Sequence, residues 1–183
     1  MNNQVTIISF SSRERGNCEQ IADFLSSLFI SVELYQFSKF QLKPCGSCAY
    51  ECFQKSKSCP HLGDRERALM DAICKSRTVY FVMPNYQDYP CANFFVFQER
   101  MQGYFHEYPL QREPFRNVVK RFVVVSNTGI NSFRKIAEQY GSSDTDLLVL
   151  KSREFGMSSI KDSIIQSAQV QARIRAFVGA DQL

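Results

Sequence analysis

Short apolar runs alternate along this chain with segments whose apolar residues recur at helical spacing. The runs are rich in β-branched and aromatic residues and short enough for strands. They cover residues 4–9 (QVTIIS), 32–35, 78–83 (TVYFVM), 121–126 (RFVVVS) and 146–150 (DLLVL). Helices are expected over 17–29, from Asp64 to about 75, over 92–105, from about 130 to Gly141, and in a long last segment that includes Ile160, Ile164 and Ile174. Residues 107–117 are expected to be irregular.

This alternation predicts an α/β fold with a parallel sheet, helices on both faces and right-handed crossovers. The strand candidates are apolar throughout, as strands covered on both faces are. No repeat or linker interrupts the pattern, so we expect a single domain over residues 1–183. Open α/β sheets bind ligands at the carboxyl ends of their strands. The loops after the first, third and fourth strands are therefore the candidate site.

Composition excludes several classes of protein. The 183 residues are 44% hydrophobic and carry a net charge of +4, which excludes wholesale disorder and gives no indication of nucleic-acid binding. No apolar stretch approaches the roughly 20 residues of a membrane span. The first residues lack the features of a signal peptide, so we expect a cytoplasmic protein with neither a nucleic-acid nor a membrane partner. Seven cysteines, an odd number, favour reduced thiols or metal ligands over disulfides.

The loop after the first strand has the composition of an anion site. It contains Ser11, Arg13, Gly16, Asn17 and Cys18 at the start of the first helix. Free amides at a helix start bind anions, and the planar arginine fork suits a phosphate. The alternative is a helix cap with solvated polar residues.

Two further loops carry amide and aromatic side chains. Pro84, Asn85 and Tyr86 follow the third strand, and residues 126–129 follow the fourth. The second of these loops consists of Ser126, Asn127, Thr128 and Gly129. A flat ring lying across both loops would leave its phosphate in the first.

Residues 38–63 form a cysteine-rich segment that is too long for a routine connection. Four thiolates within fifteen residues, Cys45, Cys48, Cys52 and Cys59, can hold a tetrahedral metal or a [4Fe–4S] cluster. A zinc site of Cys45, Cys48, Cys59 and His61 is an alternative, although the Cys59–His61 spacing is short. The third alternative is four unliganded thiols.

Taken together, these motifs resemble the NADPH-dependent FMN reductases and their iron–sulfur flavoprotein relatives in the flavodoxin-like superfamily. The resemblance rests on Ser11-x-Arg13-x-x-Gly16-Asn17, the segment from Cys45 to Cys59, Pro84-Asn85-Tyr86 and Glu99-Arg100. It implies a flavodoxin-like three-layer sandwich with a five-stranded parallel sheet in the order 2-1-3-4-5.

The resemblance also implies FMN as cofactor, NAD(P)H as co-substrate and a homodimer or higher homo-oligomer. The residues of the first loop would surround the phosphate, those of the second would line the isoalloxazine ring, and the 126–129 turn would close its other side. The flavin does the hydride chemistry, so no catalytic acid or base is named. In the iron–sulfur flavoproteins a compact cysteine segment holds a cluster, although here three residues instead of two separate Cys48 from Cys52.

The sequence departs from the family's pattern at four positions. Phe10 replaces a glycine, Ser12 a proline, Cys18 a threonine and Phe95 a lysine. Three functions follow as hypotheses. The first is an FMN-dependent oxidoreductase passing electrons from NAD(P)H to a flavin, quinone or other small acceptor. The second is an iron–sulfur electron carrier, and the third, based on the departures, is a cofactor-free binding module.

Overall fold

Five parallel strands form the centre of the molecule. The computed structural model describes residues 4–54, 57–61 and 63–179. The sheet order is β2-β1-β3-β5-β6, and the short β4 pairs antiparallel with the end of β3. The predicted order 2-1-3-4-5 is confirmed, because β4 only shifts the numbering of the last two strands. The strands are β1 (Val5–Ser9), β2 (Val32–Gln36), β3 (Thr78–Tyr86), β4 (Tyr89–Pro90), β5 (Val119–Ser126) and β6 (Leu147–Lys151).

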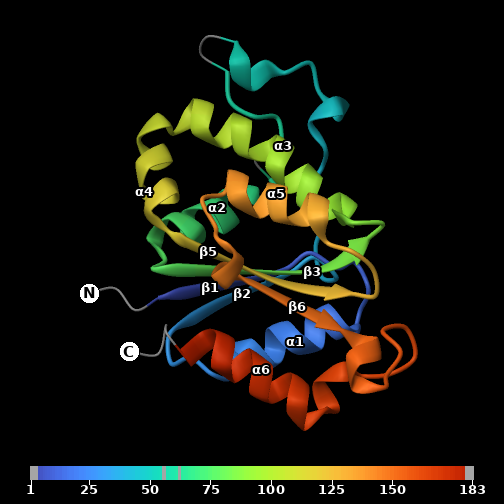
Figure 1. Ribbon diagram of the computed structural model, residues 1–183. Coiled ribbons are helices and arrows are strands. Elements are labelled where there is room, and N and C mark those ends of the chain that lie inside the picture. Colours follow the sequence, from blue (N-terminus) through green and yellow to red (C-terminus); the bar gives the residue numbers. More distant parts are fainter. Residues whose placement is uncertain (1–3, 55–56, 62, 180–183) are drawn as a thin grey trace.

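Helices cover both faces of the sheet and complete the expected three layers (Figure 1). The helices α2, α3, α4 and α5 lie on one face, and α1 and α6 lie on the other. The helices are α1 (Asn17–Ser26), α2 (Glu66–Lys75), α3 (Ala92–Glu107), α4 (Arg112–Asn117), α5 (Asn131–Gln139) and α6 (Ala168–Val178). Among the residues that the structure describes, no helix combines the length and the apolar character needed to cross a membrane.

Strand alternation divides the core into two apolar clusters. Along β3, Val79, Phe81 and Met83 point toward α2–α5, whereas Tyr80 and Val82 point toward α1 and α6. All five side chains are fully buried. Burial on both faces explains why the strands read as continuous apolar runs.

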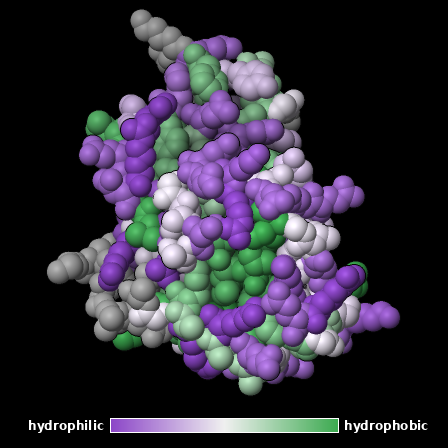
Figure 2. Space-filling view, in the orientation of Figure 1, coloured by the Kyte–Doolittle hydropathy of each residue, from purple (hydrophilic) through white to green (hydrophobic). Residues whose placement is uncertain are grey.

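One edge of the sheet faces the viewer in Figures 1 and 2. The edge strand β6 lies in front, between α5 and α6, and apolar side chains gather in the middle of this face. Leu147, Leu148 and Val149 of β6 are only partly buried there.

Three expectations about the elements are wrong. The third strand, expected over 78–83, does not stop before Pro84 but continues to Tyr86. Pairing of β1 with β3 ends at Ser9–Val82, so Pro84 has a neighbouring strand on one side only, where a missing N–H is tolerated. Residues 107–117 are not irregular, because a 3-10 turn, Pro109–Gln111, leads into α4. The last helix begins at Ala168, and Ile160 lies 71% exposed in a loop before it.

Phe10 lies in the core, at the position where the family pattern has a glycine. Its ring is fully buried, with ring centroids 5.0 Å from Phe37 and 5.3 Å from Phe94. Its backbone is equally fixed, since its N–H donates to Val82 O and its carbonyl accepts from Asn93 Nδ2 at 2.7 Å. The larger side chain is therefore accommodated by the core.

We expect Phe10→Ala to lower the free energy of unfolding by about 3–5 kcal/mol, because it removes a fully buried ring. Urea denaturation measures the change. Phe95→Ala is the matched control, since Phe95 is 39% exposed and stacks only against Phe94 among the rings of the described residues. Phe95→Ala is expected to lower the free energy of unfolding by less than about 1 kcal/mol. Equal losses in the two variants would contradict the assignment of Phe10 to the core.

Candidate functional site

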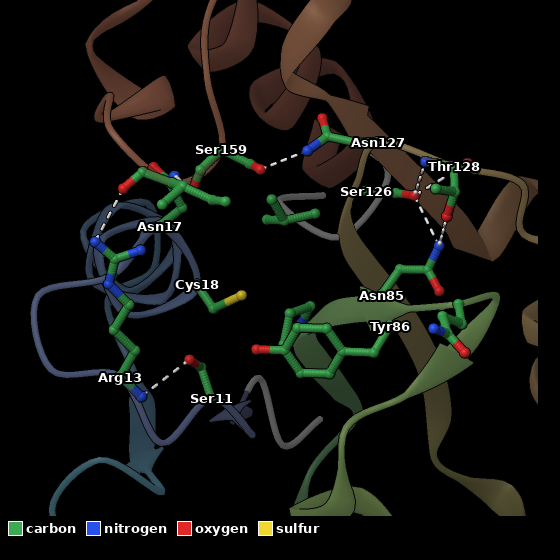
Figure 3. A pocket seen from close by; sticks show the side chains of 15 residues that line it. Ser11, Arg13, Asn17, Cys18, Asn85, Tyr86, Ser126, Asn127, Thr128 and Ser159 are labelled. Carbon is green, nitrogen blue, oxygen red and sulfur yellow. Dashed lines mark hydrogen bonds between the residues drawn. The ribbon is translucent and has the colours of Figure 1, made fainter.

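The three predicted loops meet around one cavity at the carboxyl ends of β1, β3 and β5. The cavity has a volume of about 520 Å³, within the usual range for small-molecule sites. Every predicted binding residue lines it except Gly129, whose carbonyl instead accepts from Asn85 Nδ2 at 2.9 Å. Figure 3 shows the labelled side chains arranged around the opening. The predicted residues along its wall are Ser11, Arg13, Gly16, Asn17, Cys18, Pro84, Asn85, Tyr86, Ser126, Asn127 and Thr128.

The start of α1 supplies backbone donors to one end of this cavity. Gly16 is the N-cap, and no side chain caps the helix. The first N–H groups of a helix lack intrahelical partners and carry partial positive charge. A Cβ on Gly16 would lie 3.1 Å from Arg13 O and 3.2 Å from Arg13 Cγ, so glycine permits the tight turn that places Arg13 here.

The Cys18 thiol points into the ring of residues in Figure 3. The side chain is 3% exposed, and burial, assisted by the neighbouring Cys91, raises its pKa far above the ordinary value. The group therefore stays a neutral thiol at physiological pH. It is a weaker donor than threonine but does not repel an anion.

Asn85 connects the second loop to the third. Its Nδ2 donates to Ser126 Oγ at 2.8 Å and to Thr128 Oγ1 at 3.0 Å, in addition to Gly129 O. Its Oδ1 is buried without a hydrogen-bond partner. Beside it, Tyr86 is 63% exposed at the mouth of the cavity. This wall thus presents an immobilised amide and a free aromatic face.

The cavity has a fourth wall that the sequence did not predict. Ser159 and Ile160 form this wall. Gln87 and Val125 also line the cavity, from the segments already described. The periodic isoleucines favoured a helix over this segment, yet Ser158 and Asp162 form a turn in which their side chains bond the backbone. The cluster of serines and an aspartate over 158–163 was the available signal, because such residues favour turns.

The fourth wall is bonded to residues predicted to contact the ligand. Arg13 Nη2 donates to Ile160 O at 3.0 Å, and Asn17 Nδ2 donates to Ser159 O at 2.9 Å. Figure 3 shows Asn127 bonded to Ser159 from the other side. The segment therefore connects the first loop to the third.

The cysteine-rich segment lies beyond α3, away from this cavity (Figure 1). Neighbouring cysteines contribute to the raised pKa of Cys45 and of Cys52, so these thiols lie near one another, but their bonding partners differ. Cys48 Sγ donates to Cys45 O at 3.0 Å, Cys52 packs on Gly103 of α3, and Cys59 Sγ accepts from Arg100 Nη2 at 3.7 Å. Within residues 4–54, 57–61 and 63–179, no three cysteine, histidine or acidic side chains are grouped so as to hold a metal ion. The predicted ligand set, and the zinc alternative with His61, therefore receive no support from the described residues.

An ion network holds this segment to the domain instead. Arg100 is 1% exposed, and its Nη1 lies 2.5 Å from Asp64 Oδ2 while its Nη2 lies 3.3 Å from Glu66 Oε2. It also donates to Lys43 O at 2.9 Å, and the neighbouring Glu99 accepts from Cys45 N. The Glu99-Arg100 motif thus has a structural role in this chain.

Glu66 makes this network sensitive to pH. Burial raises its pKa from 4.5 to about 7, although Arg100 opposes the shift. The folded chain then holds a proton that the unfolded chain has lost between these two values, so stability falls as pH rises through this window. We expect the stability of the wild type relative to Glu66→Gln to fall by at most about 1.4 kcal/mol per pH unit there. Urea denaturation from pH 4.5 to 7.5 measures it, and a pH-independent difference would contradict the assignment.

Several solved structures share this fold. No protein-family model matches the sequence, and no curated protein matches it significantly. The Trp repressor binding protein from Bacillus subtilis superimposes with a TM-score of 0.62 and 14% identity, covering 93% of this chain and 96% of that one. RosB with bound 8-demethyl-8-formylriboflavin-5'-phosphate superimposes with a TM-score of 0.61 and 12% identity, covering 96% of this chain and 76% of that one.

A third neighbour is FerB, a flavoenzyme NAD(P)H:(acceptor) oxidoreductase from Paracoccus denitrificans. Its TM-score is 0.53 at 12% identity, with 98% of this chain and 97% of that chain covered. At these identities the likeness establishes the flavodoxin-like fold that the motifs predicted.

Proposed function

We propose that this chain is an FMN-dependent oxidoreductase that passes electrons from NAD(P)H to a flavin, quinone or other small acceptor. The observation that carries the proposal is the cavity at the carboxyl ends of β1, β3 and β5, with anion donors at one end. Neighbours of the same fold support it, since RosB was solved with a riboflavin-5'-phosphate derivative and FerB is an NAD(P)H oxidoreductase.

The residues at the α1 end fit a phosphate. The uncapped helix start offers N–H groups, Ser11 offers a hydroxyl, and Arg13 offers a positive charge in fork geometry. Glu19, the acidic residue of the first turn, does not line the cavity and pairs with Lys39 at 3.7 Å. The lining of this end is therefore free of acidic side chains.

The remaining walls fit a flat, polar ring. Pro84, Asn85 and Tyr86 would lie along the ring, and the Ser126–Gly129 turn would lie on its other side. Bound FMN would supply the hydride transfer. The chain orients the ring, and Asn85 carries an acceptor oxygen that no described residue satisfies. The exposed Tyr86 leaves an aromatic surface where a second planar molecule can stack.

For the other partners, we propose a small-molecule acceptor, a homodimer or higher homo-oligomer, and a cytoplasmic location. The acceptor and the homo-oligomer rest on the sequence resemblance, whereas the location rests on the expectation drawn from the sequence itself. Sedimentation velocity tests the oligomeric state.

We expect purified chain to bind FMN saturably, with a resolved visible flavin spectrum, and to oxidise NADH or NADPH when an acceptor is added. Arg13→Ala should raise the Kd for FMN about 10- to 100-fold, because one charge-assisted contact to phosphate is lost. Fluorescence titration measures the Kd. Arg77→Ala is the matched control, since Arg77 is exposed beside the amino end of β3. Unperturbed FMN in the wild type would reject the proposal and favour the cofactor-free module.

The iron–sulfur carrier makes a different prediction. No three side chains of the described segment are grouped so as to hold a metal ion, so we expect flavin without iron or acid-labile sulfide in anaerobically purified chain. Iron and sulfide analysis, with the visible spectrum, decides between the two. Stoichiometric iron and sulfide, lost in Cys45→Ser, would establish the cluster and revive the electron-carrier hypothesis.

A further inference from the structure

The fourth wall of the cavity contains a self-contained turn, residues 158–162. Ser158 N donates to Asp162 Oδ2 at 2.7 Å, and Asp162 N donates to Ser158 O at 3.0 Å. The N–H groups of Ile160 and Lys161 also approach Ser158 Oγ, each at 3.3 Å. These bonds fix the shape of the turn and therefore the direction of its carbonyl groups.

Asn17 binds this turn with its whole side-chain amide. Besides Ser159 O, its Nδ2 donates to Asp162 O at 3.0 Å, and its Oδ1 accepts from Ile164 N at 2.8 Å. The side chain is 8% exposed. Since an amide nitrogen has two N–H groups, neither remains for a ligand in the cavity. The resemblance had implied direct contact between Asn17 and the phosphate.

Arg13 meets the same turn from the cavity side. Its Nη2 donates to Ile160 O, and the side chain is otherwise exposed. A guanidinium has five N–H donors in one plane. The Ile160 carbonyl occupies one of them, so it restricts the plane of the group while other donors stay available to an anion.

We infer that Asn17 is a positioning residue: it holds the 158–162 turn so that the Ile160 carbonyl orients Arg13 toward the phosphate of the ligand. The inference rests on the proposed function for the presence of a phosphate at this end. Its physical basis is preorganisation, because a charged fork fixed before binding loses less conformational entropy on binding. Asn17 then affects the phosphate only through Arg13.

A double-mutant cycle tests this path. The ratio of the Kd for riboflavin to the Kd for FMN isolates the contribution of the phosphate, because the two ligands share the ring. We expect Arg13→Ala to lower this ratio 10- to 100-fold and Asn17→Ala to lower it about threefold to tenfold. In the Arg13→Ala background, Asn17→Ala should change the ratio less than twofold. An equal effect of Asn17→Ala in both backgrounds would mean direct contact with phosphate and would overturn the inference.

A second variant perturbs the turn without changing Asn17 or Arg13. Asp162→Ala removes the carboxylate that closes the turn, so it should lower the ratio as Asn17→Ala does and again have no effect without Arg13. Asn117→Ala, an exposed asparagine at the end of α4, is the control and should leave the ratio unchanged. An unchanged ratio in Asp162→Ala would overturn the role of the turn.

Hydrogen exchange of the ligand-free chain separates this inference from the proposed function. Amides of residues 159–164 should exchange at least tenfold faster in Asn17→Ala and Asp162→Ala than in the wild type or Asn117→Ala. Absence of flavin binding by the wild type would reject the proposed function, while the exchange rates would still test the link between Asn17 and the turn. Unchanged exchange in Asn17→Ala would overturn that link.

Discussion

The parallel direction of the sheet determines where chemistry can occur in this molecule. Because β1, β3, β5 and β6 run the same way, their carboxyl ends lie at one edge of the sheet. Beyond the short β3–β4 pairing, the polar groups of the loops that leave these ends are bonded between loops. Asn85 shows the result, since one amide nitrogen connects the end of β3 to the end of β5 and the turn that follows it. The middle of the sheet is apolar and buried, so recognition is left to the carboxyl ends of the strands and to the loops that follow them.

Local patterns were sufficient to predict most of this architecture. β-Branched runs such as Val123–Val125 are covered on both faces and cannot be read as anything but strand or buried helix, and their length decides between the two. The predicted loops converge because topology places them together. The fourth wall was not predicted because Ile160 and Ile164 fit a helical period. The side-chain bonds of Ser158 and Asp162 to the backbone favour a turn instead of a helix, and they depend on side-chain geometry. The links from Asn17 to this turn span more than 140 residues and have no local signal.

A residue can match a family's sequence motif and still have only a structural role. Arg100 belongs to the resemblance, yet its guanidinium is buried between Asp64 and Glu66 and secures the cysteine-rich segment. The four cysteines themselves suggested a common ligand, but their spacing says nothing about the directions of their thiols. Phe10 is the opposite case, because it departs from the family's motif and packs against Phe37, Phe94 and Phe97 in the core.

The first loop is anchored at both ends, and this has a thermodynamic consequence. On one side Phe10 is locked in the core, and Asn93 Nδ2 bonds both Phe10 O and Ser12 Oγ. On the other side the loop passes directly into α1. A ligand arriving here has little backbone left to order, so calorimetry of binding should register desolvation of the ring without the large heat-capacity change of coupled folding. Association should then be limited by diffusion and orientation, with no slow conformational phase.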